Sequence, residues 1–204
     1  MIRRRHIAVF LALCLGGAPR CPAAGDPAPA GATAKSLCDA LVAAMKAGAS
    51  MPFSARYQML APEIRRDFDL ALMSRIVVGP PWRQLGAQDR QDFVDAFSDY
   101  SIANYAQRFK SFSGERFEVD PTPTTLANGD CVVHTKLFTG GPDPVQLDYL
   151  MRLGNGQWRI IDVFLSGTIS EMAARRSEYS LTLRTGGAPA LVSLLRKKTA
   201  ELSN

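Results

Sequence analysis

Hydrophobic residues recur at helical spacing most densely between residues 68 and 112. In the first part of this stretch one face is apolar, formed by Phe68, Leu72, Met73 and Ile76. Asp69 lies near the start, where a carboxylate suits the helix dipole, and Gly79 and Pro80 supply a stop. The pattern predicts a helix of about three turns.

The second part carries an aromatic stripe made of Phe93, Phe97, Tyr100, Tyr105 and Phe109. Asp and other polar residues mark the opposite, solvated side of this longer predicted helix. Such a stripe is most often an ordinary core face packed on a sheet. It can also form the wall of an apolar cavity for a ligand without charge, and the two interpretations are compatible.

Helical spacing continues toward the N-terminus. It predicts a helix over Ala34–Lys46 that ends at Gly48, and a second helical stretch over Ser54–Asp67 that Pro62 breaks or restarts.

The period changes from helical to alternating after Arg116. The predicted strands are Phe117–Asp120, Cys131–Phe138, Val145–Leu153 and Gln157–Leu165. The last of them is apolar on both faces, so we expect both faces to be covered. Short turns between the strands imply an antiparallel sheet.

Two further helices are expected at the C-terminus. Thr168 and Glu171 have the spacing of a capping box for a helix that runs to Leu183, and Ala188–Leu202 forms the last helix after Gly186-Gly187. The order of helices, sheet and helices predicts an α+β fold, with helices laid on a curved antiparallel sheet.

The N-terminus has the pattern of a secretory signal: three arginines, an apolar run over Ile7–Gly17, and small residues near position 24. We expect a signal peptide over residues 1–24, a flexible leader over 25–33 and one domain over 34–204. Cleavage after Ala23, Ala24 or Gly25 is compatible with the pattern. The protein is expected to be exported to the periplasm.

The signal segment changes the charge of the chain. It holds four arginines and no acid, so the formal charge of +5 falls by four, to +1. Nucleic-acid binding therefore loses its main support, because it needs clustered cations. The remaining clusters, at residues 65–66, 175–176 and 196–198, are expected to be solvated helix faces, one of which could meet an anionic membrane or an acidic partner.

Few residues offer chemistry after the signal segment. Cys38 and Cys131 remain, and an oxidising periplasm allows them to pair or to stay as small apolar residues. His134 is alone, which excludes a multi-histidine metal site, and no motif for a cofactor is present. Asp162 could act as a buried base, or it could accept hydrogen bonds from a helix start or from Arg159. We expect no catalysis.

Four blocks of sequence carry a family resemblance, and they span residues 35–202: FDLALMSRIVVGPPWRQ, QDFVDAFSDYSIANYAQRF, GNGQWRIIDVFLSGTIS and RRSEYSLTLRTGGAPALVSLLRKK. Their order and spacing resemble the MlaC and toluene-tolerance family of periplasmic lipid-binding proteins. The forms DVFLSGTIS and GGAPAL are most similar to its hopanoid-associated branch, HpnM. One departure is Gly86-Ala87 before the long helix, where a Ser or Thr with Pro is frequent, and this predicts a weaker cap.

The resemblance implies an NTF2-like fold around a deep apolar pocket, and a shuttle without catalytic activity. Its partners would be an inner-membrane lipid transporter and an outer-membrane lipid acceptor. The HpnM branch implies a hopanoid-type polycyclic lipid and a transporter of the resistance-nodulation-division type. Three alternatives stay open: a phospholipid shuttle, a small cavity enzyme and an adaptor without ligand.

We expect the pocket to be lined by apolar and aromatic residues, each of which could equally be core that never meets ligand. The helices would contribute Phe68, Leu72, Ile76, Phe93, Phe97, Tyr100 and Tyr105, and the sheet would contribute Leu147, Tyr149, Met151 and Val163.

Overall fold

The computed structural model describes residues 26, 28–48 and 50–203, so the predicted signal peptide lies outside the described residues. The helices are α1 (Ala28–Ala47), α2 (Phe53–Asp67), α3 (Leu70–Val78), the short 3-10 helix η1 (Pro80–Gln84), α4 (Ala87–Arg108) and α5 (Glu171–Leu202). Within the described part of the chain, no helix is both long enough and apolar enough to cross a membrane.

One antiparallel sheet lies between α4 and α5 in the sequence. Its strands are β1 (Arg116–Val119), β2 (Thr124–Thr125), β3 (Cys131–Phe138), β4 (Val145–Gly154), β5 (Gln157–Leu165) and β6 (Ile169–Ser170). They are ordered β1-β3-β4-β5-β6, and β2 pairs with β3. The predicted order of helices, sheet and helices is confirmed, and the fold is α+β and NTF2-like.

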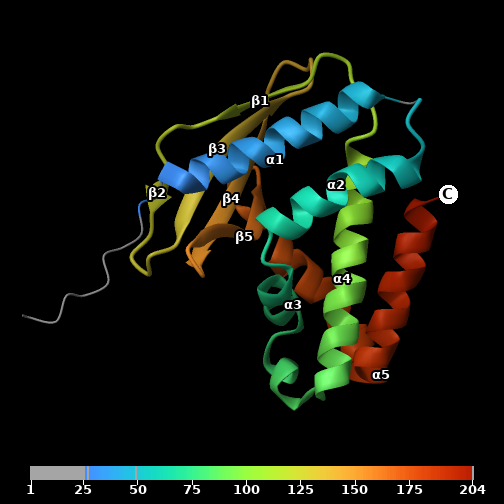
Figure 1. Cartoon of the computed structure of the whole chain (residues 1–204). Helices are drawn as coiled ribbons and strands as arrows, with labels where there is room; N and C mark the ends of the chain where they lie inside the picture. The colour runs from blue at the N-terminus through green and yellow to red at the C-terminus, as the bar shows by residue number, and fades with distance from the viewer. Residues whose placement is uncertain (1–25, 27, 49, 204) are drawn as a thin grey trace, which may run out of the picture.

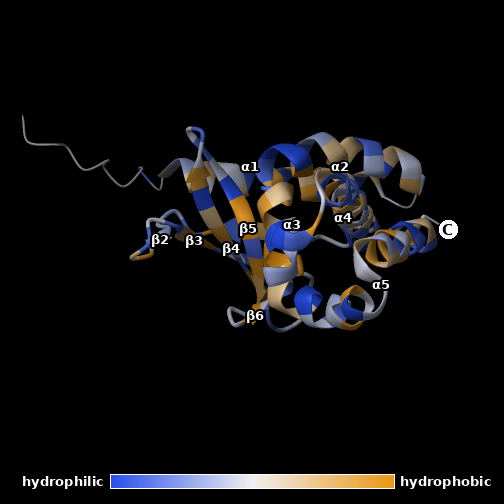
Figure 2. Ribbon diagram, turned by 90° about the horizontal axis from the view of Figure 1, so that it is seen from below, coloured by the Kyte–Doolittle hydropathy of each residue, from blue (hydrophilic) through white to orange (hydrophobic). Residues whose placement is uncertain are grey.

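The helices pack against one face of the sheet. Helix α1 crosses this face, while α4 and α5 run side by side next to it (Figure 1). Figure 2, seen from below, shows the sheet on one side of the molecule and α3, α4 and α5 on the other. The face under the helices is apolar: Cys131, Val133, Tyr149, Met151, Ile160 and Val163 are all buried. The core therefore lies between the sheet and the helical layer.

The junction of α2 and α3 is hydrogen-bonded to β5 of the sheet. Phe68 forms a parallel bridge with Ile160 of β5, and the amide of Asp69 donates to the Ile160 carbonyl at 2.9 Å. Asp69 also caps α3, since its carboxylate accepts from the amide of Leu72 at 2.9 Å. Gly79 ends the helix with a φ of 69°, a left-handed conformation that suits glycine. The predicted start and stop of this helix are confirmed.

Three expectations about the helix ends are wrong. Helix α1 begins at Ala28, so most of the expected leader is helical. Pro62 does not break α2, which runs from Phe53 to Asp67 with this exposed proline inside it. Ser170, not Thr168, caps α5, because its hydroxyl accepts from the amide of Ala173 at 3.0 Å.

Two other features of the helices match expectation. Gly86 precedes α4 without any side-chain cap, as the departure from the family pattern predicts. The predicted break at Gly186-Gly187 is a kink, since Gly187 has a φ of 66° and a ψ of −167° within α5.

Candidate functional site

A small cavity of about 50 Å³ lies between the C-terminal half of α4, strands β4 and β5, and the first residue of α5. Its lining comprises Asn104, Tyr105, Arg108, Phe109, Leu147, Tyr149, Val163, Leu165 and Glu171. These residues are distant in sequence, so the cavity depends on the tertiary fold.

Strand register brings the sheet side of the cavity together. Leu147 pairs with Leu165, and Tyr149 pairs with Val163, so all four side chains project from the same face. A bulge follows in β5, where Ile161 is the extra residue, so the alternation shifts along β5 while β4 keeps its own. The cavity floor is therefore made of two consecutive cross-strand pairs.

Helical spacing brings the α4 side together. Tyr105 and Arg108 are three residues apart, and Tyr105 and Phe109 are four apart, so they share one face of the helix end. The rings of Tyr105 and Phe109 stack with centroids 5.7 Å apart. Phe68 meets Tyr105 edge to face at 5.5 Å and supports it from behind.

The two tyrosines that line the cavity are neutral. Burial raises the pKa of the Tyr105 and Tyr149 phenols above the usual range, so both stay neutral at physiological pH. The Tyr149 hydroxyl lies beside the Cys38 thiol, whose pKa burial raises to about 12. Apolar surface with neutral hydroxyls suits an apolar ligand that carries at most a few polar groups.

Two charged side chains, Arg108 and Glu171, also line the cavity. Arg108 is exposed and Glu171 is half-buried. The Glu171 carboxylate accepts from Nη2 of Arg175 at 2.6 Å. Arg108 therefore offers an exposed cation to the polar end of a ligand whose apolar part lies inside, while the Glu171 carboxylate is already paired.

The volume limits what the cavity holds in this conformation. Pockets for small-molecule ligands usually measure about 300–1,000 Å³, and this one measures about 50 Å³. A ligand of ordinary size therefore needs a wider conformation of this cavity than the one described.

Of the eleven predicted lipid-binding residues, the structure brings four together in this cavity: Tyr105, Leu147, Tyr149 and Val163. Phe68 touches the cavity wall through Tyr105. Met151 lies on the same sheet face, fully buried and opposite Ile160, beyond the bulge.

The other five predicted residues lie elsewhere. Phe93 and Phe97 stack at 6.0 Å and are fully buried in the core, with Trp82 against Phe93. Tyr100 faces α5, where the Arg175 guanidinium lies 5.0 Å from its ring centre. Leu72 is half-buried on α3 and Ile76 lines a separate hollow beside α5. For these five, the interpretation as core or helix packing fits the geometry.

Sequence reasoning missed five lining residues: Asn104, Arg108, Phe109, Leu165 and Glu171. The aromatic stripe already contained Phe109, and the strand pattern already contained Leu165, so both had a signal. The three polar residues, Asn104, Arg108 and Glu171, had no such signal in the sequence. They become neighbours only because the start of α5 lies close to the end of α4.

Asp162 accepts hydrogen bonds that connect β5 to the start of α5. Its Oδ1 accepts from the amides of Val163 at 2.8 Å and Met172 at 3.1 Å, and its Oδ2 accepts from the Ser170 hydroxyl at 2.5 Å. The interpretation that it accepts hydrogen bonds from a helix start is confirmed. Its position against the first turn of α5 also suits the helix dipole.

The structure also places the two cysteines and the histidine that the sequence offers for chemistry. Cys38 and Cys131 are both free and buried, so they do not pair. His134 lies in β3 with its Nδ1 3.1 Å from Oδ2 of Asp148. Among the residues that the structure describes, no group of three His, Cys, Asp or Glu side chains could hold a metal ion.

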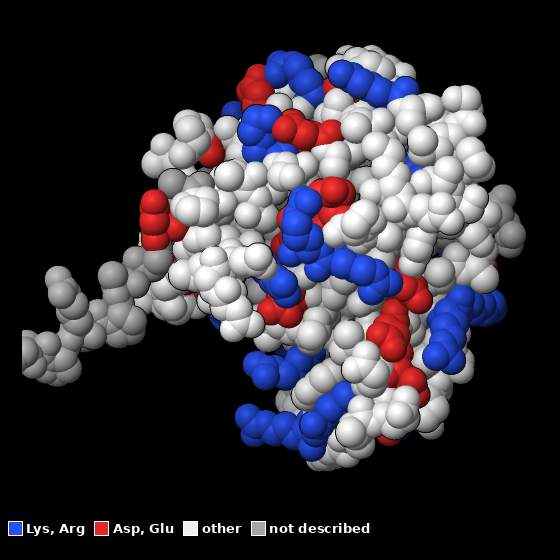
Figure 3. Space-filling view, in the orientation of Figure 1, with Lys and Arg blue, Asp and Glu red and all other residues white. Residues whose placement is uncertain are grey.

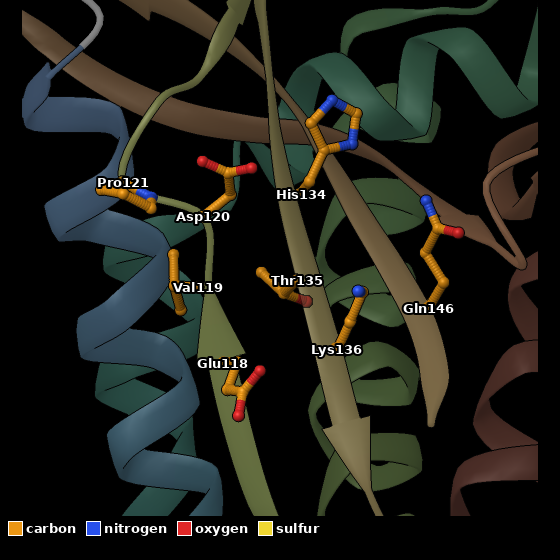
Figure 4. Close-up of a pocket in the computed structure, with 8 residues that line it drawn as sticks. All are labelled: Glu118, Val119, Asp120, Pro121, His134, Thr135, Lys136 and Gln146. Carbon is orange, nitrogen blue, oxygen red and sulfur yellow. The ribbon is translucent and has the colours of Figure 1, made fainter. Parts of the chain in front are cut away.

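A second hollow, of about 330 Å³, lies over β1, β3 and β4 on the sheet face opposite the helices (Figure 4). Glu118, Asp120, His134, Lys136 and Gln146 surround it. Figure 4 shows these side chains in front of the strands, with helices behind. Five of its eight lining residues carry charged, imidazole or amide groups, whereas most residues that line the cavity between α4 and the sheet are apolar or aromatic. The cavity between α4 and the sheet is therefore the better match to the apolar pocket that the resemblance implies.

Comparison with known proteins gives a structural match and a family match. A phospholipid-binding protein from Ralstonia solanacearum, solved in complex with a phospholipid, superimposes with a TM-score of 0.75 at 23% identity, over 87% of this chain and all of the other. This likeness establishes the shared fold. The family model described as MlaC protein matches residues 35–197, well over half of the sequence. The chain therefore belongs to the MlaC family.

Proposed function

We propose that this protein is a periplasmic lipid-binding shuttle that carries one lipid at a time between an inner-membrane transporter and an outer-membrane acceptor. Membership of the MlaC family supports the proposal. So does the phospholipid bound by a protein of the same fold.

One observation carries the proposal: the cavity between α4 and the sheet, which is lined mainly by apolar and aromatic side chains and whose two phenols are neutral. A lipid crosses water only while its apolar area is buried, at roughly 25 cal/mol per Å². The cavity supplies such a surface at the point where α4 rests on the sheet. Widening it by moving α4 exposes further apolar residues to the ligand.

Phospholipid is the first candidate cargo, because the structural neighbour binds one. The rim cation Arg108 gives a phosphate a partner beside the cavity. A hopanoid-type polycyclic lipid is the second candidate. The blocks DVFLSGTIS and GGAPAL favour it, and the first of them contains Val163 and Leu165 of the cavity.

The experiment introduces a charge where the ligand would lie. Leu165→Arg places a guanidinium at the half-buried edge of the cavity, where the protein can still fold. A bound lipid would have to desolvate that charge at a cost of several kcal/mol. We expect lipid that co-purifies with the protein to fall by more than about tenfold.

Leu181→Arg is the matched control, because Leu181 is 61% exposed on α5 and away from the cavity. Lipid content is measured by solvent extraction and mass spectrometry, and folding by circular dichroism. Equal lipid content in both variants would contradict the cavity as the binding site. The extracted lipid class, phospholipid or polycyclic, decides between the two cargoes.

A further inference from the structure

The basic clusters that stand out in the sequence are largely neutralised in the structure. Arg65 pairs with Asp99 at 2.8 Å. Arg175 is buried and pairs with Glu171 at 2.6 Å. Arg66, Lys197 and Lys198 each have an acidic partner as well. Of the seven cations in these clusters, only Arg176 and Arg196 therefore have no acidic partner among the described residues.

Three arginines from the consecutive elements α3, η1 and α4 and a fourth from α5 instead lie together at one end of the molecule. Arg75 on α3, Arg83 in η1 and Arg90 on α4 line an open groove of about 920 Å³ together with Gly79, Pro80, Trp82 and Gln84. The Arg176 guanidinium of α5 lies over Gly79, so close that a Cβ there would come within 2.9 Å of it. No pattern in the sequence joins these four positions.

The charges in this groove are not compensated. Among the described residues, the guanidinium groups of Arg75, Arg83 and Arg176 have no acidic partner, and all three are exposed. Arg90 alone is engaged, through bonds from its Nε to the Trp82 carbonyl at 3.1 Å and from its Nη2 to the Arg83 carbonyl at 3.1 Å. Arg90 therefore fixes the shape of the loop, and the other three present free charge.

The loop that carries the groove is rigid and partly apolar. Pro80 and Pro81 are exposed in η1, which restricts the backbone before any partner binds. Trp82 is half-buried, with its ring against Phe93 at 6.4 Å and the Arg90 guanidinium 5.9 Å from its centre. Basic side chains project at the lower left edge of Figure 3, where Figure 1 places α3 and the segment after it.

We propose that this groove, lined by Arg75, Trp82, Arg83 and Arg90 with Arg176 beside it over Gly79, docks the protein on the surface of a bilayer that contains anionic phospholipids. Guanidinium groups form bidentate hydrogen bonds with phosphate, and tryptophan is frequent at the interface between head groups and acyl chains. The inference rests on the proposed function, since a lipid carrier must reach a membrane to exchange cargo.

The position of the groove is compatible with exchange. Arg90 lies near the start of α4 and the cavity lies near its end, about 20 Å farther along the helix axis. Docking at the groove therefore leaves the cavity rim uncovered. The groove tethers the carrier while α4 and the sheet remain free to part.

The test measures co-sedimentation with vesicles of phosphatidylglycerol and phosphatidylcholine in equal parts, and with phosphatidylcholine vesicles as reference. We expect the wild type to bind only the anionic vesicles and to be released at high salt. Each arginine near an anionic surface contributes about fivefold in affinity. The triple variant Arg75→Gln, Arg83→Gln and Arg176→Gln should therefore bind roughly a hundredfold more weakly.

The matched control is Lys136→Gln, Arg184→Gln and Arg196→Gln, which removes the same charge from exposed positions elsewhere. It should bind nearly as tightly as the wild type. Equal weakening in both triple variants would overturn the groove as the docking site. Failure of the wild type to bind anionic vesicles would overturn the bilayer as the partner and point to an acidic protein surface instead.

Lipid content of the same preparations separates this inference from the proposed function. The groove variant should keep the lipid content of the wild type, because none of its three residues lines the cavity. Wild-type protein that binds vesicles through the groove but carries no lipid would contradict the shuttle and not the docking surface. Loss of lipid together with vesicle binding in the groove variant would contradict the separation of the two sites.

Discussion

At the level of single residues, the reactivity of the two buried thiols reports on the packing between the helices and the sheet. Burial raises the pKa of Cys38 to about 12 and that of Cys131 to about 11, so almost no thiolate exists at pH 8. We expect both to resist alkylation by iodoacetamide in the native protein and to react rapidly once denaturant is added. Intact mass measures the modification.

A fast reaction of either cysteine without denaturant would contradict the packing of α1 on the sheet. A mass lower by two hydrogens would reveal a disulfide and contradict the two free thiols. Sequence alone left this pairing open, because it cannot measure the distance between a helix residue and a strand residue.

Single residues of the cavity show the limit of sequence reasoning. Leu147 and Tyr149 were predictable from strand alternation, because burial on one face has a period of two. Phe97 has the same aromatic signal as Tyr105, yet it packs in the core while Tyr105 lines the cavity. Periodicity identifies a buried face but not which part of that face stays open.

At the level of elements, Asp162 joins strand β5 to helix α5. Asp162→Ala leaves the amides of Val163 and Met172 and the hydroxyl of Ser170 without their acceptor. We expect it to lower the free energy of unfolding by about 2–3 kcal/mol. Asp162→Asn keeps one oxygen acceptor and should cost about 1 kcal/mol. Urea denaturation gives both values.

Lipid content provides the functional control for these variants. Asp162 does not line the cavity, so Asp162→Asn should retain the lipid content of the wild type. A large loss of lipid in a variant that remains folded would show that Asp162 acts on the ligand as well as on the helix start.

Element boundaries were predictable where local chemistry decides them. Asp69 and Gly79 fix the ends of α3, and strands β3 and β5 occupy their expected ranges. The sequence did not predict the boundaries that depend on tertiary contacts. The start of α1 packs near the sheet, where the Trp158 indole donates to the Asp26 carbonyl at 2.9 Å, so helix extends into a segment whose Ala, Pro and Gly content indicates a loose leader.

At the scale of the whole molecule, the fold places two surfaces at opposite ends of α4. One end rests on the sheet and encloses a small apolar cavity, and the other carries the uncompensated arginines. The order of elements predicted the first arrangement, because helices on one face of a sheet must bury apolar residues between them. The second arises only in three dimensions, since its residues come from α3, η1, α4 and α5.

The central claim is that one lipid binds inside the cavity, and native mass spectrometry of protein purified from the cells that naturally produce it measures this most directly. We expect a mass above that of the bare polypeptide by one lipid molecule, in a complex that survives in aqueous buffer and dissociates in organic solvent. A mass equal to the polypeptide alone, in protein that is folded and purified without detergent, would contradict it.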